Sequence, residues 1–140
     1  IDFIDGLDLQ QIIEGQGRKL SIDDIVQMTE KLLAAVGFIH ANDMLHRDIS
    51  PDNVLIDKKG QPVLIDFQSY VVLPRWLPPL ARYLEKIDLS GVYKAWSKSL
   101  PGTLDEPRQG LLDRVNARRK WWVLKGYLGM GRLAGRRRRR

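Results

Sequence analysis

Hydrophobic residues recur at the spacing of one helix face from residue 22 to residue 40, and this is the clearest periodic pattern in the chain. The positions that share this face are Ile22, Ile25, Val26, Leu32, Leu33, Val36 and Ile39. Ser21 and Asp24 approximate a capping box before the run, and Asn42 is a candidate C-cap after it. The pattern therefore predicts one long amphipathic helix over residues 22–40.

The segment before this helix predicts a strand, a turn and a short helix. Residues 1–4 are typical of the end of a buried strand, and Asp5–Gly6 predicts a turn that leaves it. Residues 7–14 predict a short helix, which the glycines within residues 15–17 are expected to end. The apolar side of this helix is formed by Leu9, Ile12 and Ile13.

Two short apolar runs of strand type follow the long helix, at residues 54–56 and 62–65. The residues Asp57–Gly60 between them predict a hairpin turn with glycine at its end. A hairpin brings its flanks together, so Asn53 and Asp66 should lie side by side although they are thirteen positions apart.

Asp48 lies five residues before Asn53, and its side chain is expected to face the same pocket as Asn53 and Asp66. A carboxylate and an amide in this arrangement can hold Mg²⁺ through oxygen ligands, while the other carboxylate orients an attacking hydroxyl. The alternative is a buried hairpin whose loop carboxylates have no catalytic role. The pattern thus indicates a candidate phosphotransfer site.

The run from His46 to Ile56, followed by Leu64–Phe67, resembles the catalytic loop and the metal-binding loop of the protein-kinase-like superfamily. The resemblance includes the order and the separation of both motifs, and it covers roughly the first half of the chain, residues 1–67. It implies an α+β fold: a kinase C-lobe that is mainly helical, with a small β-hairpin carrying the catalytic and metal loops. It also implies ATP and Mg²⁺ as cofactors and transfer of the γ-phosphate to a hydroxyl.

The resemblance assigns a catalytic set and a nucleotide-binding set. In the catalytic set, Asp48 is the base, and Asn53 and Asp66 are the metal ligands. The nucleotide-binding set consists of Ile4, whose backbone would face adenine, Asp8, which would lie near the ribose, and Leu55, which would pack beneath adenine.

Several of these residues also have a structural interpretation. In this interpretation the Asp8 carboxylate lies at the N-terminus of a helix, where the helix dipole stabilises it, and Leu55 is an ordinary core leucine. We interpret His46 and Phe67 as packing residues that fix the two loops, and His40 as structural rather than catalytic.

The sequence departs from the kinase pattern at two positions. Ser50 replaces the lysine that serine/threonine kinases usually carry two residues after the base, so one γ-phosphate contact is missing or supplied elsewhere. Gln68 replaces the glycine after Asp-Phe, and a non-glycine residue resists positive φ. The loop should therefore flip less readily between active and inactive states than in a regulated kinase.

The second half predicts short helices. Residues 80–85 and 89–97 predict two of them, with Tyr93 and Trp96 as core anchors, and residues 104–107 predict another helix start. The apolar side of that last helix would be formed by Leu111, Leu112 and Val115. This abbreviated layout resembles the RIO-like and lipopolysaccharide-kinase-like branches of the superfamily.

The composition fits one domain with a sizeable core, since the chain has 140 residues of which 44% are hydrophobic. Cysteine is absent, which excludes a disulfide framework and a cysteine metal site. No apolar run approaches the length of a membrane span, and no signal peptide is visible, so we expect a cytoplasmic protein, at most peripheral at the inner face of the membrane.

The positive charge is concentrated in the last part of the chain. Residues 1–107 contain 11 Lys and Arg against 16 Asp and Glu, whereas residues 108–140 contain 12 against 1. We therefore divide the chain into a kinase-like C-lobe, residues 1–122, and a basic tail, residues 123–140, which we expect to be disordered. The run Arg136–Arg140 would attract an anionic membrane surface or nucleic acid. We expect Trp121 and Trp122 to close the core of the C-lobe instead.

These features favour an ATP-dependent phosphotransferase with a protein Ser/Thr acceptor. One alternative is a kinase of lipopolysaccharide core sugars, and another is a non-catalytic pseudokinase or scaffold with a polyanion-binding tail. Residues 1–140 contain neither a Gly-rich phosphate loop nor a strand lysine that an N-lobe would supply, so the chain is expected to be a fragment. This stretch alone should therefore bind ATP weakly.

Overall fold

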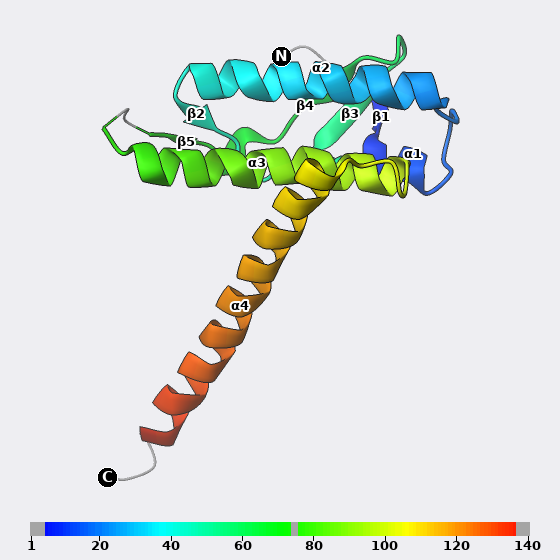
Figure 1. Cartoon of the computed structure of the whole chain (residues 1–140). Helices are drawn as coiled ribbons and strands as arrows, with labels where there is room; N and C mark the ends of the chain where they lie inside the picture. Colours follow the sequence, from blue (N-terminus) through cyan, green and yellow to red (C-terminus); the bar gives the residue numbers. More distant parts are fainter. Residues whose placement is uncertain (1–4, 74–75, 137–140) are drawn as a thin grey trace.

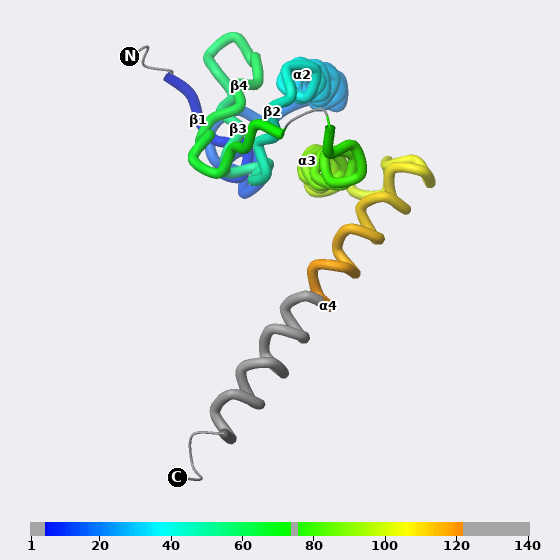
Figure 2. The backbone as a smooth tube through the Cα atoms, turned by 90° about the vertical axis from the view of Figure 1, so that its left-hand side faces the viewer, coloured from blue at the N-terminus to red at the C-terminus, as the bar shows by residue number. Residues whose placement is uncertain are grey.

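The structure is a computed structural model that describes residues 5–73 and 76–136, with side chains described as far as residue 121. Two long helices, α2 (Ile22–Ala41) and α3 (Pro78–Ser99), run side by side in opposite directions, and the strands lie next to them (Figure 1). A third long helix, α4 (Glu106–Arg136), packs against α3 and then runs obliquely away from the body (Figures 1 and 2).

Two small antiparallel sheets accompany the helices. The first has the order β1–β3–β4, built from β1 (Gly6–Asp8), β3 (Val54–Asp57) and β4 (Pro62–Leu64). The second pairs β2 (Met44–Leu45) with β5 (Val71–Val72). The remaining short elements are α1 (Leu9–Ile13) and the 3₁₀ turns η1 (Pro51–Asn53) and η2 (Phe67–Ser69). The helix-rich arrangement with small antiparallel sheets confirms the α+β class.

One hydrophobic core joins the helices to the first sheet and to the loop after β2. Its buried members are Leu9, Ile25, Met28, Leu32, Val36, Ile49, Val54, Ile56, Val92 and Ala95. Ile49 belongs to this core although it lies next to the candidate base Asp48. The loop that carries Asp48 is thus anchored by the burial of an apolar side chain at the next residue.

Helix α2 confirms the strongest sequence prediction. The Asp24 N–H donates to Ser21 Oγ over 3.1 Å, the Ser21 N–H donates to Asp24 Oδ2 over 2.9 Å, and Asn42 is the C-cap. The bond from the Ser21 backbone lowers the pKa of Asp24 below its ordinary value. The carboxylate therefore caps the helix at neutral pH, and this stabilisation is lost as the pH falls below 3.8 and then through the lowered pKa of Asp24.

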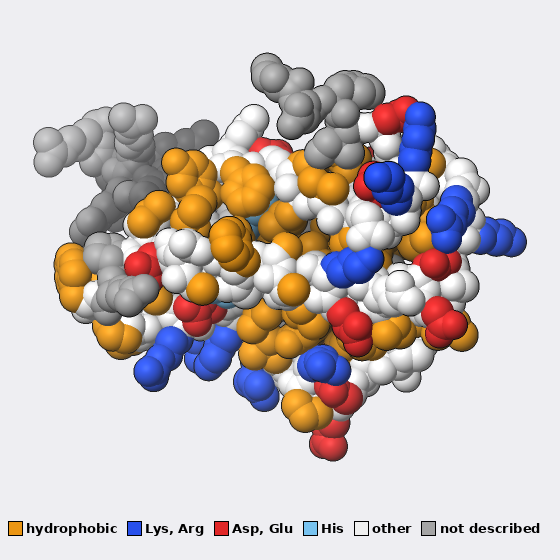
Figure 3. All heavy atoms as spheres, turned by 90° about the horizontal axis from the view of Figure 1, so that it is seen from above, with side chains coloured by type: hydrophobic (Ala, Val, Ile, Leu, Met, Phe, Trp, Pro, Cys, Tyr) orange, Lys and Arg blue, Asp and Glu red, His pale blue; other side chains and the backbone are white. Residues whose placement is uncertain are grey.

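The outer side of α2 is open to solvent. Ile22 and Phe38 are 66% and 70% exposed, so Ile22 does not face the core as its spacing predicted. Seen from above, hydrophobic side chains gather toward the left and centre of this face, and most charged ones lie toward the right and the lower edge (Figure 3).

The predicted turn at Asp5–Gly6 is wrong, and the short helix begins later than predicted. Gly6 lies in β1 opposite Asp57, where a Cβ would overlap the carbonyl oxygen of Ile56. Glycine is therefore required for the close approach of two strands rather than for a turn. Asp8 is the N-cap of α1, with its Oδ1 accepting from the Gln11 N–H over 2.7 Å. The predicted buried strand over residues 1–4 lies outside the described residues.

Helix α3 is one continuous helix where the sequence predicted two. Residues 86–88 between the predicted pair contain no glycine or proline, so nothing breaks the helix there. Tyr93 and Trp96 are half-buried at the junction with α4 rather than members of the core. The guanidinium of Arg108 lies over both rings, at 5.9 and 5.5 Å from their centres.

Helix α4 begins as predicted and continues further than predicted. Asp105 Oδ1 accepts from the Arg108 N–H over 3.1 Å, and Leu112 and Val115 are buried. Trp121 is 57% exposed, so the expectation that it closes the core is wrong, and the side chain of Trp122 lies outside the described residues.

Helix α4 includes the backbone of residues 123–136, and the expectation of a disordered basic tail over residues 123–140 remains a prediction. No proline interrupts this stretch, and most of its residues tolerate a helix. The proposed domain division at residue 122 remains a prediction. Among the described residues, no helix combines the length and the apolar character that crossing a membrane requires.

Candidate active site

The predicted hairpin forms and carries the candidate metal ligands on its two flanks. Asp57 Oδ1 accepts from the N–H groups of Lys59 and Gln61, both over 2.8 Å, and these bonds shape the turn. At the open end, the Ile65 N–H donates to the Asn53 carbonyl over 2.9 Å. Asn53 therefore lies opposite the residue that immediately precedes Asp66.

Asp48 and Asn53 are in direct contact. Asn53 Nδ2 donates to the Asp48 carbonyl over 2.9 Å and to Asp48 Oδ2 over 3.3 Å. These bonds fix the orientation of the Asn53 amide and, within the described residues, leave its Oδ1 without a hydrogen bond. The Asp48 side chain is exposed, so it is accessible to an incoming hydroxyl.

Asp66 adopts a backbone conformation that is unusual for a residue with a side chain. It lies in the left-handed region, at φ 60° and ψ 68°, and its Oδ1 accepts from the Gln68 N–H over 3.3 Å. The sequence drew attention to the backbone of Gln68, whereas in the structure it is Asp66 that has a positive φ. Aspartate tolerates this region better than most residues, and such strain is common at functional sites.

The oxygen donors present fit a magnesium ion that is completed by phosphate and water. Within the described residues, no group of three or more His, Cys, Asp and Glu side chains could hold a metal. Mg²⁺ is commonly bound by one or two protein oxygens together with substrate phosphates, and Asn53 Oδ1 and Asp66 Oδ2 are donors of this kind. The catalytic and metal-binding roles of Asp48, Asn53 and Asp66 remain predictions.

His46 joins the two loops, as predicted for a packing residue. It is fully buried, its Nε2 lies 3.0 Å from the Ile65 carbonyl oxygen, and its ring meets that of Phe67 edge-on at 4.6 Å. Because a carbonyl only accepts, Nε2 carries the proton, which leaves Nδ1 to accept from the Asp48 N–H over 3.4 Å. One imidazole thus links the backbone of Asp48 to Ile65, the residue that precedes Asp66.

Asp88 positions the backbone of the loop before Asp48, and it was not predicted from the sequence. Its side chain is fully buried in α3 and accepts from the backbone N–H groups of His46, over 2.9 Å, and Arg47, over 2.7 Å. It also bonds His40 Nε2 over 2.9 Å, which confirms the structural role predicted for His40. The signal in the sequence is a single acid between Ile87 and Leu89.

The bond to Asp88 holds Arg47 in a strained conformation. Arg47 has a φ of 70°, which costs a non-glycine residue on the order of 1 kcal/mol. A buried charged acceptor offsets that cost because it forms a short, charge-assisted bond with the Arg47 N–H. Helix α3 therefore sets the path of the loop immediately before Asp48.

Gly91 lets α3 approach this loop closely, and Gly91→Ala is expected to disturb it. A Cβ at position 91 would overlap the carbonyl oxygen of Ile49 and lie 2.8 Å from Ile49 Cβ. Relieving such overpacking costs about 1–3 kcal/mol of unfolding free energy. Denaturant unfolding of the whole chain measures this loss.

Gly37→Ala is the matched control, because Gly37 is also helical but a Cβ there meets nothing within 4 Å. Alanine is the better helix former, so this change should stabilise the chain by about 0.5–1 kcal/mol. Equal effects of the two substitutions would contradict the close approach of Gly91 to the loop.

The structure brings together two of the three predicted nucleotide-binding residues. Asp8 and Leu55 are directly opposite in the pairing of β1 with β3. Val54 and Ile56 are buried in the core, so Leu55 faces the other side of the sheet and is not the core leucine of the alternative interpretation. Asp8 caps α1, as its own alternative predicted, and Ile4 lies outside the described residues.

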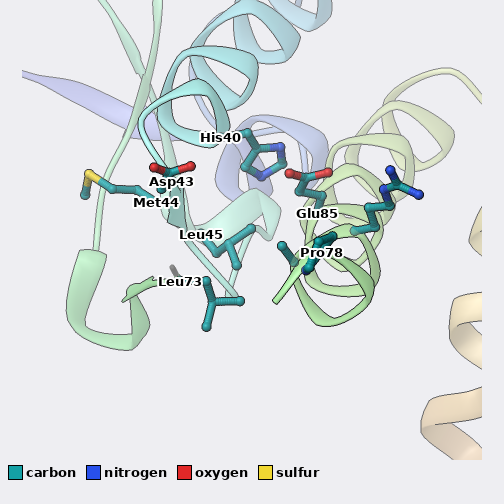
Figure 4. A pocket seen from close by; sticks show the side chains of 9 residues that line it. His40, Asp43, Met44, Leu45, Leu73, Pro78 and Glu85 are labelled. Atoms are coloured by element: carbon teal, nitrogen blue, oxygen red, sulfur yellow. The ribbon is translucent and has the colours of Figure 1, made fainter. Parts of the chain in front are cut away.

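A separate pocket of about 240 Å³ lies between the end of α2, the second sheet and the start of α3 (Figure 4). Leu45 and His40 line it, and Glu85 reaches it from α3. Neither Asp48 nor the two candidate metal ligands line this pocket, so it is distinct from the candidate active site.

Residues 1–74 match the sequence model of the family described as "Protein kinase domain". Casein kinase I homolog 1 of Saccharomyces cerevisiae is 34% identical over 101 residues, which cover 66% of this chain and 18% of the yeast protein. A probable serine/threonine-protein kinase PknB of Lactococcus lactis is 33% identical over 67 residues, 48% of this chain and 10% of that protein. Serine/threonine-protein kinase F of Synechocystis is 35% identical over 66 residues, 47% and 13% of the two chains.

The chain thus spans less than one fifth of the length of each of these relatives. The matched region contains the hairpin and all three candidate catalytic residues, Asp48, Asn53 and Asp66.

Proposed function

Because this chain belongs to the protein kinase family, we propose that the protein transfers the γ-phosphate of ATP to a serine or threonine hydroxyl of a protein substrate, with Mg²⁺ as cofactor. The observation that carries the proposal is the contact between Asp48 and Asn53 on a loop that His46 links to the strand before Asp66. A buried hairpin with incidental carboxylates would not need this set of bonds.

Each candidate catalytic residue has a defined role in this proposal. Asp48 accepts a hydrogen bond from the acceptor hydroxyl, orients its oxygen and takes its proton. Asn53 and Asp66 would hold the metal ion, which neutralises charge on the phosphates when it is bound. Positioning and charge neutralisation supply most of the rate in phosphoryl transfer, so the rigid support from His46 matters as much as the base.

The relatives favour a protein acceptor over the alternatives. Proteins named serine/threonine kinases are similar to this chain over 67 and 66 residues, about half of its length. The described residues offer no specific feature for a lipopolysaccharide sugar, and the RIO-like branch rests only on the short second half. The pseudokinase alternative predicts an intact loop without phosphotransfer.

The test is transfer of labelled phosphate from ATP by the full-length protein to a mixed protein substrate, with lipopolysaccharide as a parallel acceptor. We expect labelling of protein that EDTA abolishes and added Mg²⁺ restores, because both proposed ligands are hard oxygen donors. Labelling of lipopolysaccharide alone would favour the sugar kinase, and no labelling of either acceptor would favour the pseudokinase.

A further inference from the structure

Helices α3 and α4 enclose a groove whose walls carry four cationic side chains. The groove has a volume of about 650 Å³ and is lined by residues of both helices. Figure 2 shows how α4 diverges from α3 as it leaves the body. Arg82 and Lys86 line it from α3, and Arg114 and Arg118 line it from α4. None of the residues that line it is acidic. The concentration of positive charge is therefore built by two elements that are far apart in the sequence.

Ion pairs do not account for the four cations. Within the part of the chain that the structure describes, no ion pair involves Arg82, Lys86, Arg114 or Arg118. Each helix places its two cations four residues apart, where like charges repel and destabilise a helix. An anionic ligand would relieve this repulsion between the cations.

The groove also has an apolar floor. Val115 is buried, and Tyr83 and Leu111 are half-buried beneath the cations. The Arg118 guanidinium lies over the Tyr83 ring at 5.5 Å, which orients this side chain at the rim. A second hollow of about 530 Å³ shares Tyr83 and Arg118 and extends the groove to Trp121, which is 57% exposed.

We infer that this groove binds an acidic segment of a partner protein that carries apolar side chains among its carboxylates. Carboxylates match the cationic rims, and apolar side chains match the floor of Tyr83, Leu111 and Val115. A membrane surface is flat and would not reach a concave floor. A nucleic acid could contact the cations through its phosphates, but its sugar-phosphate backbone is polar and would leave the apolar floor of Tyr83, Leu111 and Val115 without a matching partner.

The charge distribution favours a local docking site for such a segment. Residues 1–107 carry more acidic than basic residues, so the rest of the body repels an acidic partner. Among residues 1–121 the attraction is therefore directed to the α3–α4 groove, and the run Arg136–Arg140 stays unchanged in every variant of the test below. Because the four cations are exposed, binding should weaken as the salt concentration rises.

The test uses the full chain and a fluorescein-labelled peptide of repeated Asp-Glu-Leu, followed by fluorescence anisotropy at low and high salt. The double variant Arg82→Gln with Arg114→Gln should bind the peptide about tenfold more weakly, since it removes one cation from each wall. The matched control is Lys94→Gln with Arg119→Gln, which removes two exposed cations from the same helices but outside the groove. The control should bind within about twofold of the parent chain.

Further probes identify the occupant. A peptide with Asn and Gln in place of the acids should bind weakly to every variant, because it lacks the charge that the rims recognise. Equal losses in the groove variant and in the control would overturn the proposal, because they would indicate attraction to the net charge alone. Tighter groove-dependent binding of a single-stranded oligonucleotide or of phosphatidylserine vesicles than of the acidic peptide would overturn the choice of occupant. Groove-dependent self-association in sedimentation would do the same.

Discussion

Replacing Asp48 with asparagine is expected to lower phosphotransfer by the full-length protein by about 100- to 10,000-fold, the range that a general base contributes. The change removes the proton acceptor but preserves the shape of the side chain. Asn53 Nδ2 keeps its bond to the backbone carbonyl of residue 48, so the loop should stay in place. The loss should therefore lie in kcat, with little change in KM for ATP.

Asp52→Asn is the control for this experiment. Asp52 is exposed on the same loop, in η1, and loses the same charge, yet it is in neither the predicted metal set nor the base position. Its activity should stay close to that of the parent protein. Wild-type turnover by Asp48→Asn would exclude Asp48 as the base, whereas equal losses in both variants would indicate a general effect of charge on the loop.

The elements that the sequence predicted well are those whose signals are local. Helix α2 has an apolar face, a capping box and a C-cap within one continuous stretch, and the structure contains all three. The hairpin depends on two short apolar runs and one turn, and its register follows from these. The proximity of Asn53 to Asp66 was therefore predictable without any long-range information.

The misread positions are those whose role depends on a distant neighbour. Gly6 predicted a turn because glycine usually does, but its function is to admit the carbonyl of Ile56 from a strand fifty positions away. Asp88 was not among the residues predicted to have a role, and its partners His46 and Arg47 are more than forty positions upstream. A single sequence contains no signal for such pairs.

The continuity of α3 and the path of the loop before Asp48 depend on each other, because Asp88 joins them across more than forty positions. The sequence predicted two helices on either side of residues 86–88. In the structure the carboxylate is saturated by donors from the loop and from His40, so the helix continues through it. A buried polar group is tolerated when its bonds are complete.

Asp88→Ala should therefore have the largest effect on the stability of the chain. It leaves the buried N–H group of His46 without its acceptor, at a cost of about 1–3 kcal/mol, and it also leaves the partly buried N–H group of Arg47 without one, at a smaller cost. It also removes the bond that holds Arg47 at a φ of 70°. We expect denaturant unfolding to report a loss of about 3 kcal/mol or more.

Hydrogen exchange separates loss of the loop from loss of the fold. In the parent chain, the His46 and Arg47 amides should be protected because Asp88 accepts from both. In Asp88→Ala these two amides should exchange rapidly in the absence of denaturant, whereas the amides in the middle of α2 should stay protected.

Asp113→Ala is the control variant. It removes an exposed acid of α4 that bonds Gln109, and it should change the free energy of unfolding by less than about 0.5 kcal/mol. If Asp88→Ala matched that control in both measurements, α3 would not be what positions the catalytic loop, and the strain at Arg47 would have to be held by the loop itself.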